Sequence, residues 1–269
     1  MNHVVCKLNE GDSFSLTKAT FLVNLNKKND YRYTFFNTGH LRKLYQFDRM
    51  FLNEALDLFY ISLMVYYADR KVRRADAYDA WTREFKLYIP VLEIKKWNKN
   101  KKLLEDMISY LSGDIWNFEF RKRELNTDEI KLTEGFKRKN KKWVPDCFCM
   151  LSGGLDSFIG AVDLLEQTKN IAFIGHYGGG KGVAEYQKFV INNLSKEYTL
   201  TSNQFFNFYA ATIGGVEDTT RTRSLMFFAH AFILASVKKG KKPVYIPENG
   251  LISLNIPLVH FPSHATAEK

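Results

Sequence analysis

The residues of this chain best suited to chemistry form a short loop, Ser152-Gly153-Gly154-Leu155-Asp156-Ser157. It follows the apolar run at residues 147–151, so the pattern predicts a strand that ends in a glycine-rich turn and opens into a helix. Two glycines let the backbone approach a phosphate closely, and the amides at a helix start favour anions. Ser152 and Ser157 add hydroxyl donors. Asp156 beside a polyphosphate requires a divalent cation between them. The loop therefore predicts a site for a nucleotide with Mg²⁺.

The loop is not a Walker A motif, because the lysine of that motif is absent. It instead resembles the SGGxDS loop of the PP-loop ATP pyrophosphatases, and all five defining positions match: Ser152, Gly153, Gly154, Asp156 and Ser157. That resemblance implies cleavage of ATP between its α and β phosphates. It also implies that an oxygen of the substrate is activated as an adenylate, from which an amine or sulfur nucleophile displaces AMP.

Two arginines stand at the start of a second predicted helix. Arg221 and Arg223 precede the apolar run at residues 225–235, which is apolar almost all round and so predicts a buried helix. A guanidinium at the positive end of a helix dipole is unfavourable unless an anion lies between the two. We therefore interpret Arg223 and Arg221 as anion-binding residues, with surface arginines as the alternative.

Glu248 and Asn249 follow a further predicted strand, at residues 244–247. Glu248 is a candidate ligand for Mg²⁺ or acceptor for the edge of a purine-like ring, and Asn249-Gly250 is typical of a tight turn. We interpret His230, inside the apolar helix, as a core residue.

The elements that must position these residues alternate along the second part of the chain. Strands are predicted at residues 147–151, 171–176, 205–209 and 244–247, and helices at 156–167, 183–196 and 223–239. This alternation predicts right-handed crossovers and a parallel sheet covered on both faces. Ligands bind beyond the carboxyl ends of such strands. We therefore expect the loop at Ser152 to meet the segments that follow the other three strands in one crevice.

Residues 1–142 predict a smaller, basic α+β domain, and residues 143–269 a PP-loop ATPase domain. Two runs, 21–25 and 31–36, flank a polar loop and suggest a β-hairpin. Apolar spacing predicts a helix at 44–67, and weaker patterns predict strands at 84–92 and 115–120 with a helix at 103–111. The charge run at 137–142 suits a surface loop at the boundary.

Several segments together resemble the branch of PP-loop enzymes founded by the 7-cyano-7-deazaguanine synthases (QueC-like), and most closely the QueC-like proteins of anti-phage operons of the Qat type. The segments that carry this resemblance are residues 151–157, Tyr177-Gly178, residues 221–228 and residues 247–258. It implies that residues 152–157, Leu155 included, bind ATP phosphates with Mg²⁺ on Asp156. It further implies Tyr177 and Gly178 beside the nucleotide, Arg223 at the α-phosphate or activated carboxylate, and Arg221, Glu248 and Asn249 near the substrate.

The resemblance implies an α/β fold with the parallel sheet of the PP-loop (adenine nucleotide α-hydrolase-like) type. It implies an ATP-dependent ligase in anti-phage defence that adenylates a carboxylate, with 7-carboxy-7-deazaguanine as the expected substrate and other proteins of the operon as partners. The product would be an amide, a nitrile or a conjugate with an amine. The synthases also carry a four-cysteine zinc site, yet no CxxC occurs here. Two explanations stay open: a missing carboxyl-terminal segment, or a zinc-free branch.

The composition bounds the cellular setting. The net charge is +10, and residues 1–145 hold 28 of the 39 Lys and Arg but 19 of the 29 Asp and Glu. This excess suits nucleic-acid binding or a merely solvated basic face. Three cysteines cannot make a disulfide framework, no apolar run is long enough for a membrane helix, and the first residues lack a signal-peptide layout. We therefore expect a cytoplasmic protein that does not enter a membrane.

Three other functions remain open. SGGLDS also suits an asparagine-synthetase-like amidotransferase, although no cysteine heads the chain to act as a glutaminase nucleophile. A PP-loop tRNA-modifying enzyme would account for the basic first half. A nucleotide-binding subunit without catalysis would account for a missing carboxyl-terminal segment.

Overall fold

The structure is a computed structural model, and it describes residues 1–9, 11–25, 31–33, 44–47, 50–137, 143–167, 170–178, 182–237 and 242–248. These residues form an α/β fold with two sheets, each built mainly of parallel strands. The first sheet has the order β2-β1-β4-β5, with β1 at Asn2–Lys7, β2 at Phe21–Asn24, β4 at Glu84–Val91 and β5 at Ile115–Lys122.

The helices of the first half cover one face of this sheet. They are α2 at Asn53–Lys71, α3 at Ile94–Lys99 and α4 at Lys101–Ser112. Along β5 the side chains of Trp116, Phe118 and Phe120 are buried while those of Ile115 and Glu119 are exposed, which is the alternation of a strand with one packed face. A further helix, α5 at Thr127–Lys137, follows this sheet in the chain.

The second sheet has the order β3-β8-β7-β6-β9. Its strands are β3 at Tyr31–Tyr33, β6 at Cys147–Met150, β7 at Ile171–Tyr177, β8 at Phe205–Thr212 and β9 at Val244–Tyr245. Every pairing in it is parallel except that of β3 with β8. The prediction of alternating strands and helices in this half is therefore confirmed.

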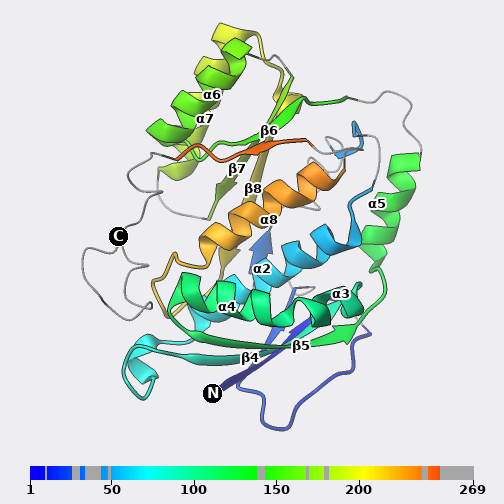
Figure 1. Ribbon diagram of the computed structural model, residues 1–269, viewed down its shortest axis with the longest axis vertical. Helices are drawn as coiled ribbons and strands as arrows, with labels where there is room; N and C mark the ends of the chain where they lie inside the picture. Colours follow the sequence, from blue (N-terminus) through cyan, green and yellow to red (C-terminus); the bar gives the residue numbers. More distant parts are fainter. Residues whose placement is uncertain are drawn as a thin grey trace.

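Helices cover both faces of the second sheet. On one face lie α6 at Leu155–Gln167 and α7 at Val183–Tyr198, and on the other lies α8 at Arg223–Ser236 (Figure 1). Strand β6 contributes side chains to the core on both faces of the sheet. Cys147 and Cys149 belong to the core under α6 and α7, whereas Phe148 and Met150 belong to the core under α8. The two cysteines thus share one face of the strand and act as core residues.

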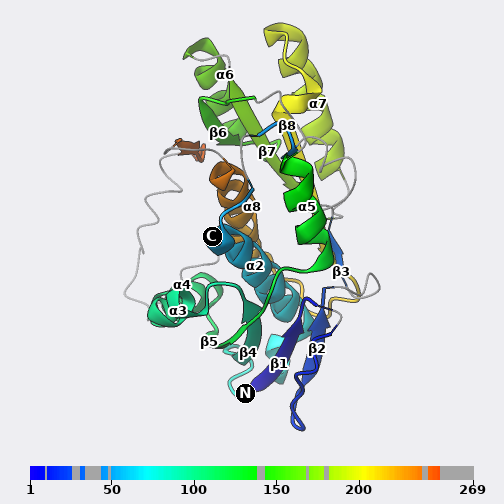
Figure 2. The same ribbon diagram turned by 90° about the vertical axis from the view of Figure 1, so that its right-hand side faces the viewer.

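Helices α2 and α8 lie side by side between the two sheets, as both views show (Figures 1 and 2). This position explains why 13 of the 19 residues of α2 are buried. One continuous core takes in side chains of both sheets and both helices. The division at residue 142 stays a prediction, but α2 and β3 from the first half both pack into the second.

The β-hairpin predicted from residues 21–25 and 31–36 is wrong for the residues that the structure describes. Strand β2 pairs in parallel with β1, with Val4 opposite Phe21, while β3 pairs with β8 in the other sheet, with Tyr31 opposite Thr212. Local sequence suggested a hairpin because a polar loop separates two apolar runs. Pairing with distant strands prevails over that local signal. The first sheet is consequently parallel, where an α+β arrangement was expected.

The helix predicted at 44–67 begins later, at Asn53, and runs to Lys71. Phe47 and Phe51 lie before it, yet both are buried in the core. The spacing of these two residues therefore reflects their burial in the core and not a helix. Within the described residues, no helix is both long and apolar enough to cross a membrane.

Candidate functional site

The loop from Ser152 to Ser157 is closed by its own hydroxyl groups. Ser157 Oγ accepts hydrogen bonds from Ser152 Oγ at 3.0 Å and from the Gly153 amide at 3.2 Å, and it donates to the Gly154 carbonyl at 2.8 Å. The Gly154 amide donates to Ser152 Oγ at 3.3 Å. Both amide bonds are long for N–H···O contacts. The two glycine amides are therefore held in place weakly enough for an anion to replace their partners.

Gly153 is required at its position for two reasons. Its φ is +92°, a region that residues with a side chain rarely adopt. A Cβ there would also lie 2.9 Å from Gln187 Cγ and 3.2 Å from the Gln187 amide nitrogen. The loop thus passes directly over the start of α7, and only glycine allows this approach.

Helix α6 begins at Leu155, so the turn from Ser152 presents the start of a helix to its surroundings. Its first amides lack intrahelical acceptors, as at every helix start. Leu155 is largely exposed and Asp156 is half-buried. These four features match the arrangement predicted from the sequence: strand, glycine turn, helix start and one carboxylate.

The loop lies where the strand order of the second sheet reverses. Among the parallel strands of this sheet, β6 comes first in the chain, β7 and β8 lie on one side of it, and β9 lies on the other. In open parallel sheets ligands bind at such a switch point, beyond the carboxyl ends of the strands. The residues after β6 and β9 must therefore face one another.

A pocket of about 90 Å³ opens at this point. It is lined by the loop hydroxyls of Ser152 and Ser157, by Glu248 after β9, and by Ser224, Phe227 and Phe228 from the first turns of α8, together with Met150, Ile246 and Pro247. Close packing fixes the β9 side, since a Cβ on Gly160 of α6 would lie 2.6 Å from Pro247 Cβ. The structure thus brings the loop, the start of α8 and Glu248 together around one cavity.

The two arginines at the start of α8, Arg223 and Arg221, have different surroundings. Arg223 is exposed and lies within electrostatic reach of His176 at the end of β7, where its charge helps to lower the pKa of that imidazole. Its neighbour Ser224 lines the pocket. Arg223 is therefore placed on the side of the candidate site.

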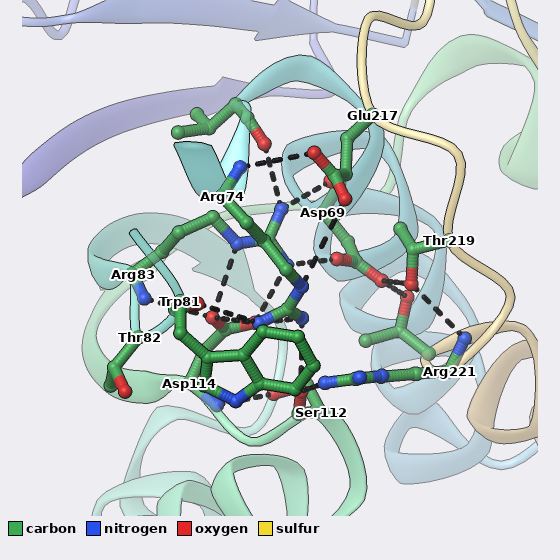
Figure 3. A network of polar contacts seen from close by, with 12 residues as sticks. Asp69, Arg74, Trp81, Thr82, Arg83, Ser112, Asp114, Glu217, Thr219 and Arg221 are labelled. Atoms are coloured by element: carbon green, nitrogen blue, oxygen red, sulfur yellow. Dashed lines mark hydrogen bonds and ion pairs between the residues drawn. The ribbon is translucent and has the colours of Figure 1, made fainter. Parts of the chain in front are cut away.

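Arg221 turns toward the first sheet instead. Its guanidinium donates to the Ser112 carbonyl at 2.7 Å and lies over the ring of Trp81, 4.9 Å from its centroid (Figure 3). Burial lowers the pKa of Arg221, and the neighbouring charge of Arg74 lowers it further. The geometry makes Arg221 part of a network between the two sheets rather than of the pocket.

His176, Tyr177 and Gly178 end β7 at the same edge of the sheet. The pKa of His176 is lowered to about 4 by burial, which outweighs its hydrogen bond to the Ala210 carbonyl at 3.3 Å. The ring of Tyr177 lies 5.3 Å from that of Tyr209, and a Cβ on Gly178 would lie 3.0 Å from the Ala210 carbonyl oxygen. These residues lie at the carboxyl end of β7, the strand beside β6, but none of them lines the pocket.

The donor set fits a nucleotide with a divalent cation. Mg²⁺ bound to nucleotide phosphates needs one or two protein carboxylates. Glu248 lines this pocket, whereas Asp156 lies in the first turn of α6, next to Ser157, and is not part of the lining. Among the described residues no group of three His, Cys, Asp or Glu side chains is placed to hold a metal. Burial raises the pKa of Cys147 to about 11 and that of Cys149 to about 12, so neither is a ready thiolate ligand. Asn249 lies outside the described residues.

Sequence analysis missed Gln187, a buried residue of α7. Its Nε2 donates to the Ser152 carbonyl at 3.0 Å and to the His176 carbonyl at 2.9 Å, so one amide ties the ends of β6 and β7 to the helix. A single glutamine on an amphipathic helix carries no signal of this role. The aromatic pair Phe227 and Phe228 was visible in the sequence only as part of an apolar helix.

Comparisons with protein-family models, with curated proteins and with solved structures found no match to this chain. Its function is therefore argued from the geometry of this site and from the residues that form it.

Proposed function

We propose that this protein is an ATP-dependent, AMP-forming C–N ligase of the PP-loop kind. One observation carries the proposal: the two loop hydroxyls, the start of α8 and Glu248 line a single pocket at the switch point of a parallel sheet. A glycine turn at a helix start supplies amides for phosphate, and a carboxylate beside it supplies a ligand for Mg²⁺.

The proposed reaction divides between two neighbouring groups of residues. The amides and hydroxyls of the 152–157 loop bind the phosphates of ATP, with Asp156 holding the cation. Arg223, at the start of α8, faces the charge that develops when a substrate carboxylate attacks the α-phosphate. The carboxylate oxygen bonds to that phosphorus, pyrophosphate leaves, and the acyl adenylate then loses AMP to a nitrogen nucleophile. The protein contributes positioning and charge stabilisation.

The sequence resemblance supports a deazapurine carboxylate, 7-carboxy-7-deazaguanine, as the substrate of this QueC-like protein in anti-phage defence. The lining of the pocket suits such a substrate. The rings of Phe227 and Phe228 line it and offer a surface for a planar heterocycle, and Glu248 offers an acceptor for ring N–H groups. Partner proteins of the same operon and ammonia or an amine as acceptor belong to this proposal.

The proposal is tested by incubating the protein with ATP, Mg²⁺ and 7-carboxy-7-deazaguanine and separating the nucleotides by chromatography. We expect AMP and pyrophosphate in equal amounts, and we expect Asp156→Asn to abolish them. Asp163→Asn is the matched control, since Asp163 is an exposed carboxylate on the same helix. Formation of ADP, or full AMP release by Asp156→Asn, would refute the assignment.

A further inference from the structure

A second and larger pocket, of about 810 Å³, lies beside the first sheet. It is formed by the end of α2, the turn after it, the starts of β1, β2 and β4, and Val216. It shares no residue with the pocket at the 152–157 loop. Its volume is within the range of sites that hold small molecules and cofactors.

Aromatic rings form one part of its lining. Phe21 and Tyr67 lie with their ring centroids 6.3 Å apart. Tyr78 lines the same pocket from the turn after α2, and its side chain is fully exposed. An aromatic side chain that no core covers is available to stack on a planar ligand.

Cations lie beside these rings. Lys71 Nζ lies 5.2 Å from the centroid of the Tyr67 ring and donates to the Gly214 carbonyl at 3.1 Å, which leaves it two further N–H donors. Arg73 is exposed, and the described part of the chain gives its guanidinium no hydrogen-bond or ion-pair partner. The Arg73 guanidinium and the remaining N–H groups of Lys71 can therefore meet an anion.

The deepest cation of the pocket has a different role. Arg83 is 2% exposed, and its guanidinium is bound by Asp69 and by Asp114 (Figure 3). Arg83 lines the pocket, but its charge is already paired with these two carboxylates and does not attract a further anion. At the rim, Asp76 offers a carboxylate acceptor.

We propose that this pocket binds a nucleoside phosphate. The base stacks on Tyr78 and offers N–H groups to Asp76, and the phosphate lies against Lys71 and Arg73. Rings beside free cations are the combination that proteins use for nucleotides and single strands. The excess of positive charge within residues 1–145 favours the approach of such a ligand. The nucleoside phosphate belongs either to a free nucleotide or to the end of a nucleic-acid strand, because both present the same chemical groups.

Fluorescence anisotropy with a labelled single-stranded 12-nucleotide probe tests the proposal, with unlabelled GMP and CMP as competitors. Competition by a mononucleotide would identify the free nucleotide as the source. Binding of the strand without such competition would identify the strand. We expect Tyr78→Ala and Arg73→Glu each to weaken binding about tenfold, the loss of one stacked base or one phosphate contact.

Matched controls make the result specific. Tyr110→Ala and Lys102→Glu remove an exposed ring and an exposed cation on α4, away from this pocket, and should bind as the unmodified protein does. Asp156→Asn should also bind normally, which separates this site from the proposed ATP site. No binding of the labelled strand, or binding by the Tyr78 and Arg73 variants equal to that of the unmodified protein, would overturn the proposal.

Discussion

Gly153 carries the most demanding backbone conformation of the candidate site. Its positive φ and its contact with Gln187 together allow the turn from β6 into α6 to pass over α7. Gly154 beside it has no such constraint, since a Cβ there would meet only Ser152 Oγ, at 3.6 Å. The two glycines of the motif therefore serve different purposes: the first shapes the loop, and the second keeps it open.

Replacement of these two glycines by alanine separates the purposes. We expect Gly153→Ala to lower the free energy of unfolding by about 1–3 kcal/mol, because it adds strain at a positive φ and crowds Gln187. Gly154→Ala should cost less than about 1 kcal/mol, since its Cβ meets no close atom. Urea unfolding of both variants measures the difference. Equal destabilisation would contradict the role given to Gly153.

His176 makes a second prediction at this scale. Its pKa is lowered from 6.5 to about 4, so the unfolded chain binds a proton there more readily than the folded protein does. Its contribution to stability is complete above pH 6.5 and is lost as the pH falls from 6.5 toward 4, by about 1.4 kcal/mol per pH unit at most. We expect His176→Gln to be less sensitive than the unmodified protein over this window in urea unfolding at several pH values. Parallel pH profiles would show that His176 is not buried in its neutral form.

Among the elements, α7 determines where the loop lies. Gln187 joins the carbonyl groups that end β6 and β7 to this helix through one buried amide. Gln187→Met keeps the size of the side chain but removes the hydrogen bonds that Gln187 donates to both carbonyls. We expect it to lower the free energy of unfolding by about 1–3 kcal/mol and to raise the KM for ATP in the AMP assay.

Lys188→Met provides the control for that substitution, because Lys188 is an exposed neighbour on the same helix. It should leave both the unfolding free energy and the KM unchanged. A Gln187→Met variant with normal stability and a normal KM would remove Gln187 from the site.

The elements also show what sequence patterns could and could not predict. The second half alternates strands and helices with clear periods, so its strands, helices and glycine loop were predictable, and the loop lies at the expected edge of the sheet. The pairing of β3 with β8 was not predictable, because its partner lies far along the chain and β-pairing depends on tertiary context. The same holds for Arg221: a helix start indicated an anion, whereas its actual partners are Ser112 at the end of α4 and Trp81 in the segment before β4.

At the scale of the whole molecule, a buried network of charges joins the first sheet to α2 and to the start of α8. Arg83 at the start of β4 is bound by Asp69 of α2 and by Asp114 before β5. Asp69 in turn accepts a hydrogen bond from Thr222 at the start of α8, at 2.7 Å. Burial alone would lower the pKa of Arg83, but hydrogen bonds and charges from Asp114 and Asp69 outweigh it and raise that pKa. The start of α8, which lines the candidate site, is thus fixed to the first sheet.

Removal of the central cation should be costly. Arg83→Met would leave the buried Asp69 without its ion-pair partner and Asp114 with Arg74 as its remaining arginine, and we expect a loss of about 3–5 kcal/mol in the free energy of unfolding. Lys102→Met, which breaks the exposed ion pair with Asp106, should cost less than about 1 kcal/mol.

The cooperativity of unfolding provides a second readout for the Arg83→Met and Lys102→Met variants. Three of the four tryptophans, at positions 81, 97 and 116, lie in the first half, so tryptophan fluorescence reports mainly that half, whereas far-UV circular dichroism reports the whole chain. We expect the two transitions to coincide, because one core runs through both halves. Separate transitions would show that the halves fold independently.

The most direct test of nucleotide binding at the 152–157 loop follows its backbone amides in ¹H–¹⁵N NMR spectra while Mg²⁺ and a non-hydrolysable ATP analogue are added. Main-chain donors at this turn should bind the phosphates, so we expect the amide resonances of Gly153, Gly154 and Leu155 to shift with saturation. The amides of β4 and β5, which lie in the other sheet, should not move. Saturable binding that leaves the three loop amides unchanged, or no binding at all, would contradict the proposed site.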